Sequence, residues 1–72
     1  MGQNMTREIL TKKYLETHRN IEPTGTKTWV FHFFINNEQA GKFSCIGDYD
    51  YAKQGALRFM KLGGYEHGEL QA

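Results

Sequence analysis

Cysteine, proline and long hydrophobic runs are nearly absent from this chain of 72 residues. Cys45 is the only cysteine, so no disulfide can form within the chain and no cysteine-based zinc cluster is available. A lone thiol is typical of a reducing environment, and we expect a cytoplasmic protein. No apolar run approaches the roughly 18–20 residues that span a bilayer, and no signal-peptide pattern opens the sequence. We therefore expect no membrane contact.

An excess of one sign of charge is also lacking. Nine Lys and Arg residues against eight Asp and Glu residues leave a formal net charge of +1. Nucleic-acid-binding domains usually carry a clear basic excess, so a binding surface here would have to arise by segregation of charge. The one concentration of positive charge lies in the first 45 residues, at Lys12, Lys13, Arg19, Lys27 and Lys42.

Signatures of catalysis and of metal binding are missing as well. His18, His32 and His67 have no metal-ligand spacing, and no Ser/His/Asp order or Gly-rich phosphate loop is present. Asp48 and Asp50 stand at the expected start of a helix, where capping explains them without chemistry. We expect a protein that is not an enzyme and that uses no cofactor and no metal.

Aromatic residues, in contrast, are concentrated in one stretch. Residues 27 to 43, "KTWVFHFFINNEQAGKF", hold four of the five phenylalanines and the only tryptophan. Apolar residues alternate with period two, then Asn36 and Asn37 supply turn residues, and "GKFSCIG" alternates again. The pattern predicts a β-hairpin with one apolar face, formed by Trp29, Phe31, Phe33, Ile35 and Phe43.

A helical pattern follows in "GDYDYAKQGALRFMKLGG". Asp48 suits the N-cap, and Gly63 and Gly64 suit the stop. The apolar stripe at helical spacing consists of Ala52, Ala56, Phe59 and Met60. The sequence therefore predicts one helix, packed across the apolar face of the hairpin.

The first third of the chain is harder to interpret. Its apolar residues fit a helical stripe poorly, so we predict a strand over residues 10 to 19 and a turn over 23 to 25, with a helix as the alternative. The predicted fold is α+β, a three-stranded antiparallel β-meander with one C-terminal helix on one face (βββα). Residues 1–8 are expected to be a flexible N-terminus, 9–64 a single domain, and 65–72 a flexible tail.

One helix covers only one face of a three-stranded sheet, so the other face should be free. That face would expose Val30, His32, Phe34 and Ile46 beside Lys42. An exposed apolar row of this kind usually marks an interface.

The order of strand, turn, "TWVFHFFINNEQAGKFSCIG" and "AKQGALRFMKLGG" resembles the later part of a double-stranded-RNA-binding domain. That family carries lysines at the start of this helix, where they contact phosphates. Here Asp48 and Asp50 stand in the same place, and carboxylates at a helix N-terminus repel phosphates. The resemblance therefore implies the fold and argues against duplex-RNA binding in that family's mode.

The same segments also resemble the arm-type N-terminal domain of tyrosine recombinases and the AP2-type domain, three-stranded sheets backed by one helix. The resemblance implies that the free sheet face enters the major groove of duplex DNA and that Lys12 or Tyr14 belongs to it. The candidate nucleic-acid-binding residues are Lys12, Lys13, Thr28, Val30, His32, Phe34, Lys42 and Ser44.

The alternative is a protein-interaction module, a small inhibitor or adaptor of the kind that phages and mobile elements encode. The same apolar face would bind another protein or form a homodimer. "DYDY" would mimic the acidic surface of nucleic acid toward a basic partner. Lys42 and His32 favour nucleic acid, whereas Phe34, Val30 and Ile46 favour protein.

Overall fold

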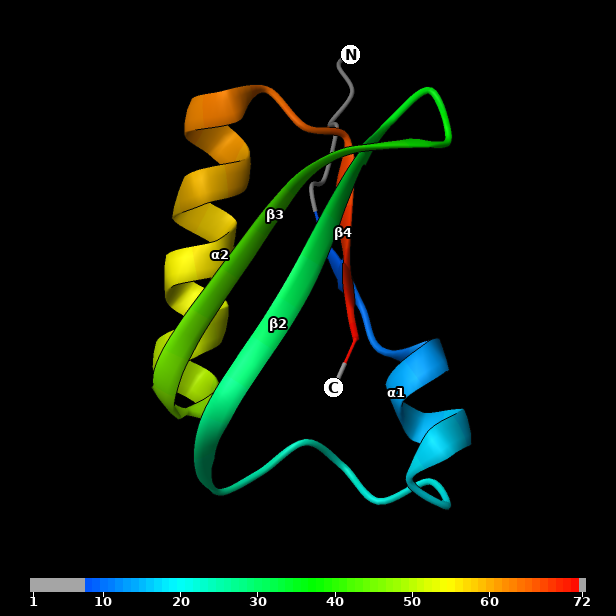
Figure 1. The fold of residues 1–72 in the computed structure, drawn as a ribbon, viewed down its shortest axis with the longest axis vertical. Helices are drawn as coiled ribbons and strands as arrows, with labels where there is room; N and C mark the ends of the chain where they lie inside the picture. The colour runs from blue at the N-terminus through cyan, green and yellow to red at the C-terminus, as the bar shows by residue number, and fades with distance from the viewer. Residues whose placement is uncertain (1–7, 72) are drawn as a thin grey trace, which may run out of the picture.

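The computed structural model describes residues 8–71, which form an α+β fold with one mixed sheet (Figure 1). The elements are β1 (Ile9–Leu10), α1 (Lys12–Thr17), β2 (Thr26–Ile35), β3 (Glu38–Asp48), α2 (Tyr49–Gly63) and β4 (His67–Leu70). The strand order in the sheet is β1-β4-β2-β3. β2 runs antiparallel to both of its neighbours, and β1 runs parallel to β4. The α+β class expected from the sequence is confirmed, but the number of strands and helices is not.

The predicted hairpin is present as β2 and β3. Trp29 pairs with Cys45 and Phe31 with Phe43, so the apolar positions of both strands share one face. Asn36 and Asn37 connect the strands with positive φ angles of 53° and 65°. Two successive positive φ angles give the turn whose twist matches that of the flanking strands. The register shifts by one residue between Phe33 and Phe34, where Phe34 pairs with Gln39 and Phe33 with Gly41, so Ala40 is an extra residue of β3. This bulge brings the apolar positions of both strands onto one face.

Helix α2 begins and ends where its capping residues predict. The Asp48 carboxylate accepts a hydrogen bond of 2.8 Å from the Tyr51 backbone N–H. Gly64 adopts the left-handed conformation at φ 71°, and the Tyr65 N–H donates to the Met60 carbonyl at 3.1 Å. Both ends of the helix therefore have partners for backbone groups that would otherwise be unpaired.

Replacing Asp48 by alanine is expected to lower the free energy of unfolding by about 1 kcal/mol, because the Tyr51 N–H loses its acceptor. Urea unfolding followed by Trp29 fluorescence measures this change. Asp48→Ser is the matched control, since a serine oxygen can accept the same bond and should retain most of the stability. Equal losses in both variants would contradict a capping role.

The strand predicted over residues 10 to 19 is wrong, since residues 12–17 form the short helix α1 and only Ile9–Leu10 is a strand. The Leu15 N–H donates to the Thr11 carbonyl at 2.9 Å. Tyr14 and His18, one helical turn apart, stack their rings at 3.9 Å, and Tyr14 also packs 5.8 Å from the Trp29 ring. The helical alternative prevails because a single turn of helix is enough to bury Tyr14, which is 5% exposed.

The tail predicted for residues 65–72 is also wrong. His67–Leu70 forms β4, which lies between β1 and β2 in the sheet. Leu70 pairs with Phe31 and is fully buried. Gly68 is buried against Phe33, where an added methyl group would come within 2.8 Å of the ring. Of the predicted flexible N-terminus, residues 1–7 lie outside the described part of the chain, and the Glu8 carbonyl accepts a hydrogen bond from the Gly68 N–H.

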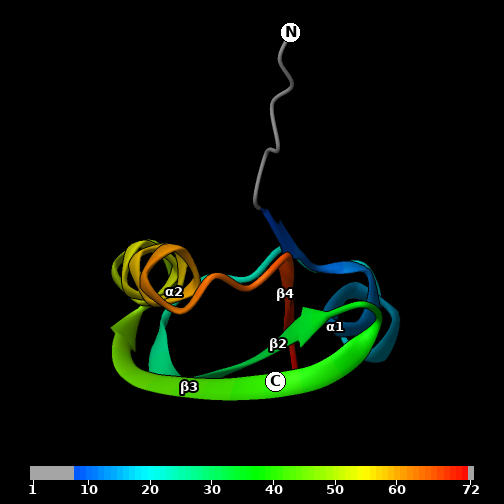
Figure 2. The same ribbon diagram turned by 90° about the horizontal axis from the view of Figure 1, so that it is seen from above.

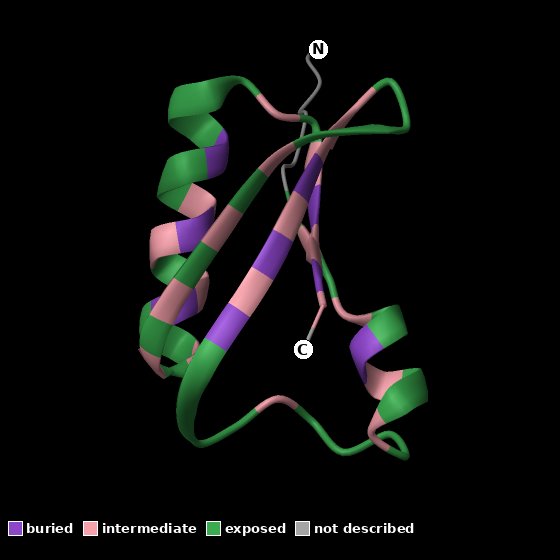
Figure 3. Cartoon of the chain, in the orientation of Figure 1, coloured by how far each residue is buried: buried purple, intermediate pink, exposed green. Residues whose placement is uncertain are grey.

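The core lies between the sheet and the two helices (Figure 3). Its buried residues are Tyr14, Trp29, Phe31, Phe33, Ala52, Ala56, Met60 and Leu70. Three residues expected there are not fully buried, since Ile35 and Phe43 are only partly buried and Phe59 is 36% exposed. Neither helix of residues 8–71 is long and apolar enough to cross a membrane.

Candidate nucleic-acid interface

One face of the sheet carries no helix. Figure 2 shows α2 on the inner side of the curved hairpin, and Tyr14 places α1 against Trp29 on that same inner side. The opposite side is not covered by any element within residues 8–71. We call this side the outer face. It consists of Thr28, Val30, His32, Phe34, Gln39, Lys42, Ser44, Ile46, His67, Glu69 and Gln71.

The centre of the outer face is polar. His32 of β2 is paired with Lys42 of β3 on one side and with Glu69 of β4 on the other. Val30 is paired with Ser44, one step further along the same two strands. The hairpin therefore brings together a cation, an imidazole and a hydroxyl, and β4, which is distant in sequence, adds a carboxylate.

Aromatic and aliphatic side chains flank this polar centre. Phe34 stacks on His67 with ring centroids 5.0 Å apart and an angle of 9° between the planes. At the other end of the face, Thr28 is paired with Ile46, which is 74% exposed. His67 and Glu69 were missed by the sequence analysis because their segment has no alternating apolar pattern.

The predicted basic residues of the first third occupy different positions from those expected. Lys12 and Lys13 belong to α1 rather than to a strand of the outer face, and Tyr14 is buried. Lys13 nevertheless reaches the rim of the outer face, where its Nζ donates to Gln71 Oε1 at 3.1 Å. Lys27 lies on the inner side, with its Nζ 4.7 Å from the centroid of the Trp29 ring. The outer face thus has Lys42 near its centre and Lys13 at its rim.

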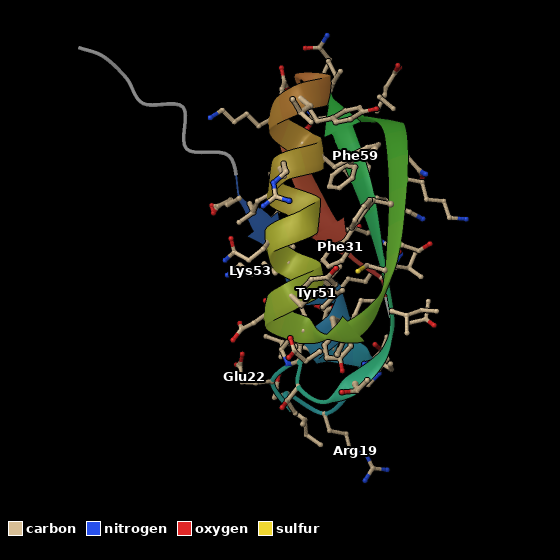
Figure 4. The ribbon with its side chains drawn as sticks, turned by 90° about the vertical axis from the view of Figure 1, so that its left-hand side faces the viewer. Arg19, Glu22, Phe31, Tyr51, Lys53 and Phe59 are labelled. Atoms are coloured by element: carbon tan, nitrogen blue, oxygen red, sulfur yellow. The ribbon has the colours of Figure 1, made fainter. Side chains whose placement is uncertain are left out.

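A second surface feature lies at the other side of the molecule, between α2 and β3. It is a groove of about 420 Å³, and Figure 4 looks into it with Tyr51 and Phe59 beside the helix. The residues that line it are Phe43, Cys45, Tyr51, Gln54, Gly55, Arg58, Phe59 and Leu62. Cys45 is partly buried at this groove. The groove could not be predicted from the sequence, because Phe43 and Phe59 were expected in the core.

The Tyr49 phenol has a perturbed pKa. Burial raises the pKa of the Tyr49 phenol above its usual value of 10.0, and the nearby carboxylates of Asp50 and Glu22 raise it further. The Tyr49 ring packs edge-on against Trp29 at 5.1 Å. A neutral, partly buried phenol beside Trp29 is suited to packing in the core rather than to proton transfer in a reaction. Within residues 8–71, no three His, Cys, Asp or Glu side chains are grouped so that they could hold a metal ion.

No protein family, no curated protein and no solved structure matches this chain. The outer face and the groove are therefore the two surface features that bear on the function of the protein.

Proposed function

We propose that the protein is a small non-enzymatic domain that binds duplex DNA through its outer face. The observation that carries the proposal is a helix-free sheet face on which His32 lies between Lys42 and Glu69, with Ser44 one step along β3. A two-stranded β-ribbon fits the major groove of B-form DNA, where every base pair presents a distinct pattern of donors and acceptors. β2 and β3 have ten and eleven residues, so they extend over about 33 Å and about 36 Å.

Different side chains of the outer face suit different parts of the DNA. Lys42 is exposed and can contact a phosphate, which positions the sheet on the duplex. The hydroxyl groups of Thr28 and Ser44 and the imidazole of His32 can hydrogen-bond to base edges. Val30 offers an apolar contact to a thymine methyl group. Lys13, at the rim, lies where a second phosphate contact would form.

Duplex DNA suits this face better than duplex RNA does. The major groove of A-form RNA is deep and narrow, so side chains on a sheet cannot reach its bases. The other site used on duplex RNA, a basic helix N-terminus, is acidic here, because α2 begins with Asp48 and has Asp50 in its first turn. These carboxylates would repel an RNA phosphate at that position.

The test is an NMR amide titration of the chain with a short mixed-sequence DNA duplex at about 50 mM and about 200 mM salt. We expect shifts confined to β2, β3 and β4, and weaker binding at the higher salt. Lys42→Glu should weaken binding about tenfold and reduce the slope of log affinity against log salt by about one, because one phosphate contact is lost. Its free energy of unfolding should stay within about 0.5 kcal/mol of the original.

Lys53→Glu is the matched control, because it makes the same change of charge on α2 and away from the outer face (Figure 4). It should reduce binding much less than Lys42→Glu does. Equal effects of the two variants would show that only net charge matters, and an unchanged affinity of Lys42→Glu would remove the proposed site. If neither salt concentration gives shifts, the outer face is to be tested as a protein-binding surface, which its exposed Ile46 favours as the second candidate.

A further inference from the structure

The groove between α2 and β3 is lined by a single charged side chain, that of Arg58, and none of its lining residues is acidic. Arg58 is exposed, and within residues 8–71 it makes no hydrogen bond, ion pair or ring contact. Gln54, one helical turn earlier on α2, lines the same groove and can donate a hydrogen bond beside it. A guanidinium pairs with a carboxylate through two parallel hydrogen bonds. Charge complementarity therefore selects an occupant that carries a carboxylate.

The rest of the groove is apolar. The Phe43 and Phe59 rings lie 5.4 Å apart, and Gly55 allows the Phe43 ring to approach the helix, where a methyl group would come within 3.1 Å of it. Tyr51 and Leu62, which are 66% and 83% exposed, lie at the two ends of the helical wall. An occupant that covers these side chains must itself present a large apolar group next to its carboxylate.

The wall that β3 contributes is the edge of the sheet. β3 pairs with β2 on one side and with no strand of residues 8–71 on the other. In an antiparallel pair, the backbone N–H and C=O groups of every second residue point away from the partner strand. β3 has eleven residues and no proline, so it presents a row of such groups to a further strand. An occupant that pairs with them has an extended backbone.

The length of the groove suits a short segment of this kind. From Tyr51 to Leu62 the helical wall rises by eleven residues, which at about 1.5 Å per residue is about 16 Å. About five residues of extended chain, at about 3.3 Å each, span the same length.

We propose that this groove binds an acidic, extended peptide segment of another protein, which pairs with β3 as a fifth strand of the sheet. Alternate residues of a strand point to the same side. The segment therefore places a large apolar side chain on the Phe43 and Phe59 rings and an Asp or Glu side chain, two positions away, on Arg58. Main-chain hydrogen bonds to β3 provide affinity, and the two side chains provide specificity.

A second copy of this chain fits the groove less well than such a peptide. Residues 41–47 of β3, which border the groove, read "GKFSCIG" and contain no carboxylate, so a second β3 paired along them brings no partner for Arg58. A small carboxylic acid would pair with Arg58 but would leave the edge of β3 open. The groove lies on the inner side of the sheet, so the peptide site is independent of the outer face and of nucleic acid.

Selection from a display library of random ten-residue peptides, with the chain alone as the target, tests the chemistry. We expect the selected peptides to share a large apolar residue and an Asp or Glu two positions apart. Arg58→Glu should weaken binding of a selected acidic peptide at least about tenfold, and selection against this variant should favour Lys or Arg instead. Lys53→Glu is the matched control, since Lys53 is on α2 but does not line the groove, and it should keep the preference for acid.

Circular dichroism checks that both variants remain folded. A library that yields no binding peptide overturns the proposal. An acidic preference that is the same with Arg58→Glu as with the original chain also overturns it.

The thiol of Cys45, the only cysteine, reports whether the selected peptide lies in the groove. Saturating peptide should slow the reaction of Cys45 with iodoacetamide several-fold, and an unchanged rate would place the peptide elsewhere and overturn the proposal. Proline at two successive central positions of the peptide should abolish binding, because one of the two lost N–H groups must face β3. If the proline peptide binds equally well, or if 3-phenylpropanoate binds as tightly as the peptide, pairing with β3 is refuted.

Discussion

Replacing Phe33 by alanine is expected to leave most of the protein unfolded at 25 °C. Phe33 is fully buried and stacks on both Phe59 and Tyr65 with ring centroids 5.3 Å away. Removing a buried phenylalanine costs about 3–5 kcal/mol, and a core of this size supplies about 3–5 kcal/mol of net stability. The two quantities are comparable, so urea unfolding followed by Trp29 fluorescence should show little or no folded baseline.

Phe34→Ala is the matched control, because it removes the same side chain from the next position of β2. Phe34 lies on the outer face and contacts His67, so its loss should cost only about 1 kcal/mol, the value of one aromatic pair at a partly exposed site. The difference between the two neighbours follows directly from the alternation of faces. If Phe34→Ala were the more destabilising change, the assignment of inner and outer faces would be reversed.

Ending the chain after Tyr65 is expected to abolish folding, because the truncation removes β4 from the interior of the sheet. β4 is the only neighbour of β1 within residues 8–71, and it pairs with β2 along four residues. Its removal also takes away Leu70, which is fully buried. Circular dichroism and the dispersion of NMR amide signals should show an unfolded chain.

Two point variants separate the loss of packing from the loss of length. Leu70→Ala should cost about 2–5 kcal/mol, enough to unfold much of the protein. Gln71→Ala, at the following position, should change stability by less than about 1 kcal/mol, because Gln71 contributes a hydrogen bond to the rim residue Lys13. If the truncated chain unfolds at the same urea concentration as the complete chain, residues 66–72 do not stabilise the fold. They would then be a tail, as predicted from the sequence.

The hairpin and α2 could be predicted from the sequence because their signals are local. Alternation with period two selects the face of each strand, and Asn36 and Asn37 set the turn between neighbouring strands. Asp48 and Gly64 bound α2 through contacts with residues three or four positions away. The existence of a free sheet face with His32 and Lys42 followed from these two elements.

The first third and the last eight residues could not be predicted in the same way. β1 and β4 have two and four residues, too few for a pattern to show, and they pair with each other across most of the chain length. α1 is a helix of six residues whose stability depends on Tyr14 packing against Trp29. Short elements of this kind form only when a partner distant in sequence is already in place.

The sequence by itself determined the α+β class, the hairpin with its turn, and the helix that packs on it. Only the tertiary structure decided that β4 lies inside the sheet, between β1 and β2, and that His67 and Glu69 join the outer face. It also decided that β3, beside Tyr51 and Leu62, is an edge strand among residues 8–71. The physical reason is the range of the interactions. Turns, caps and alternation act between near neighbours in the chain, whereas strand order is decided by which apolar surfaces can be buried together.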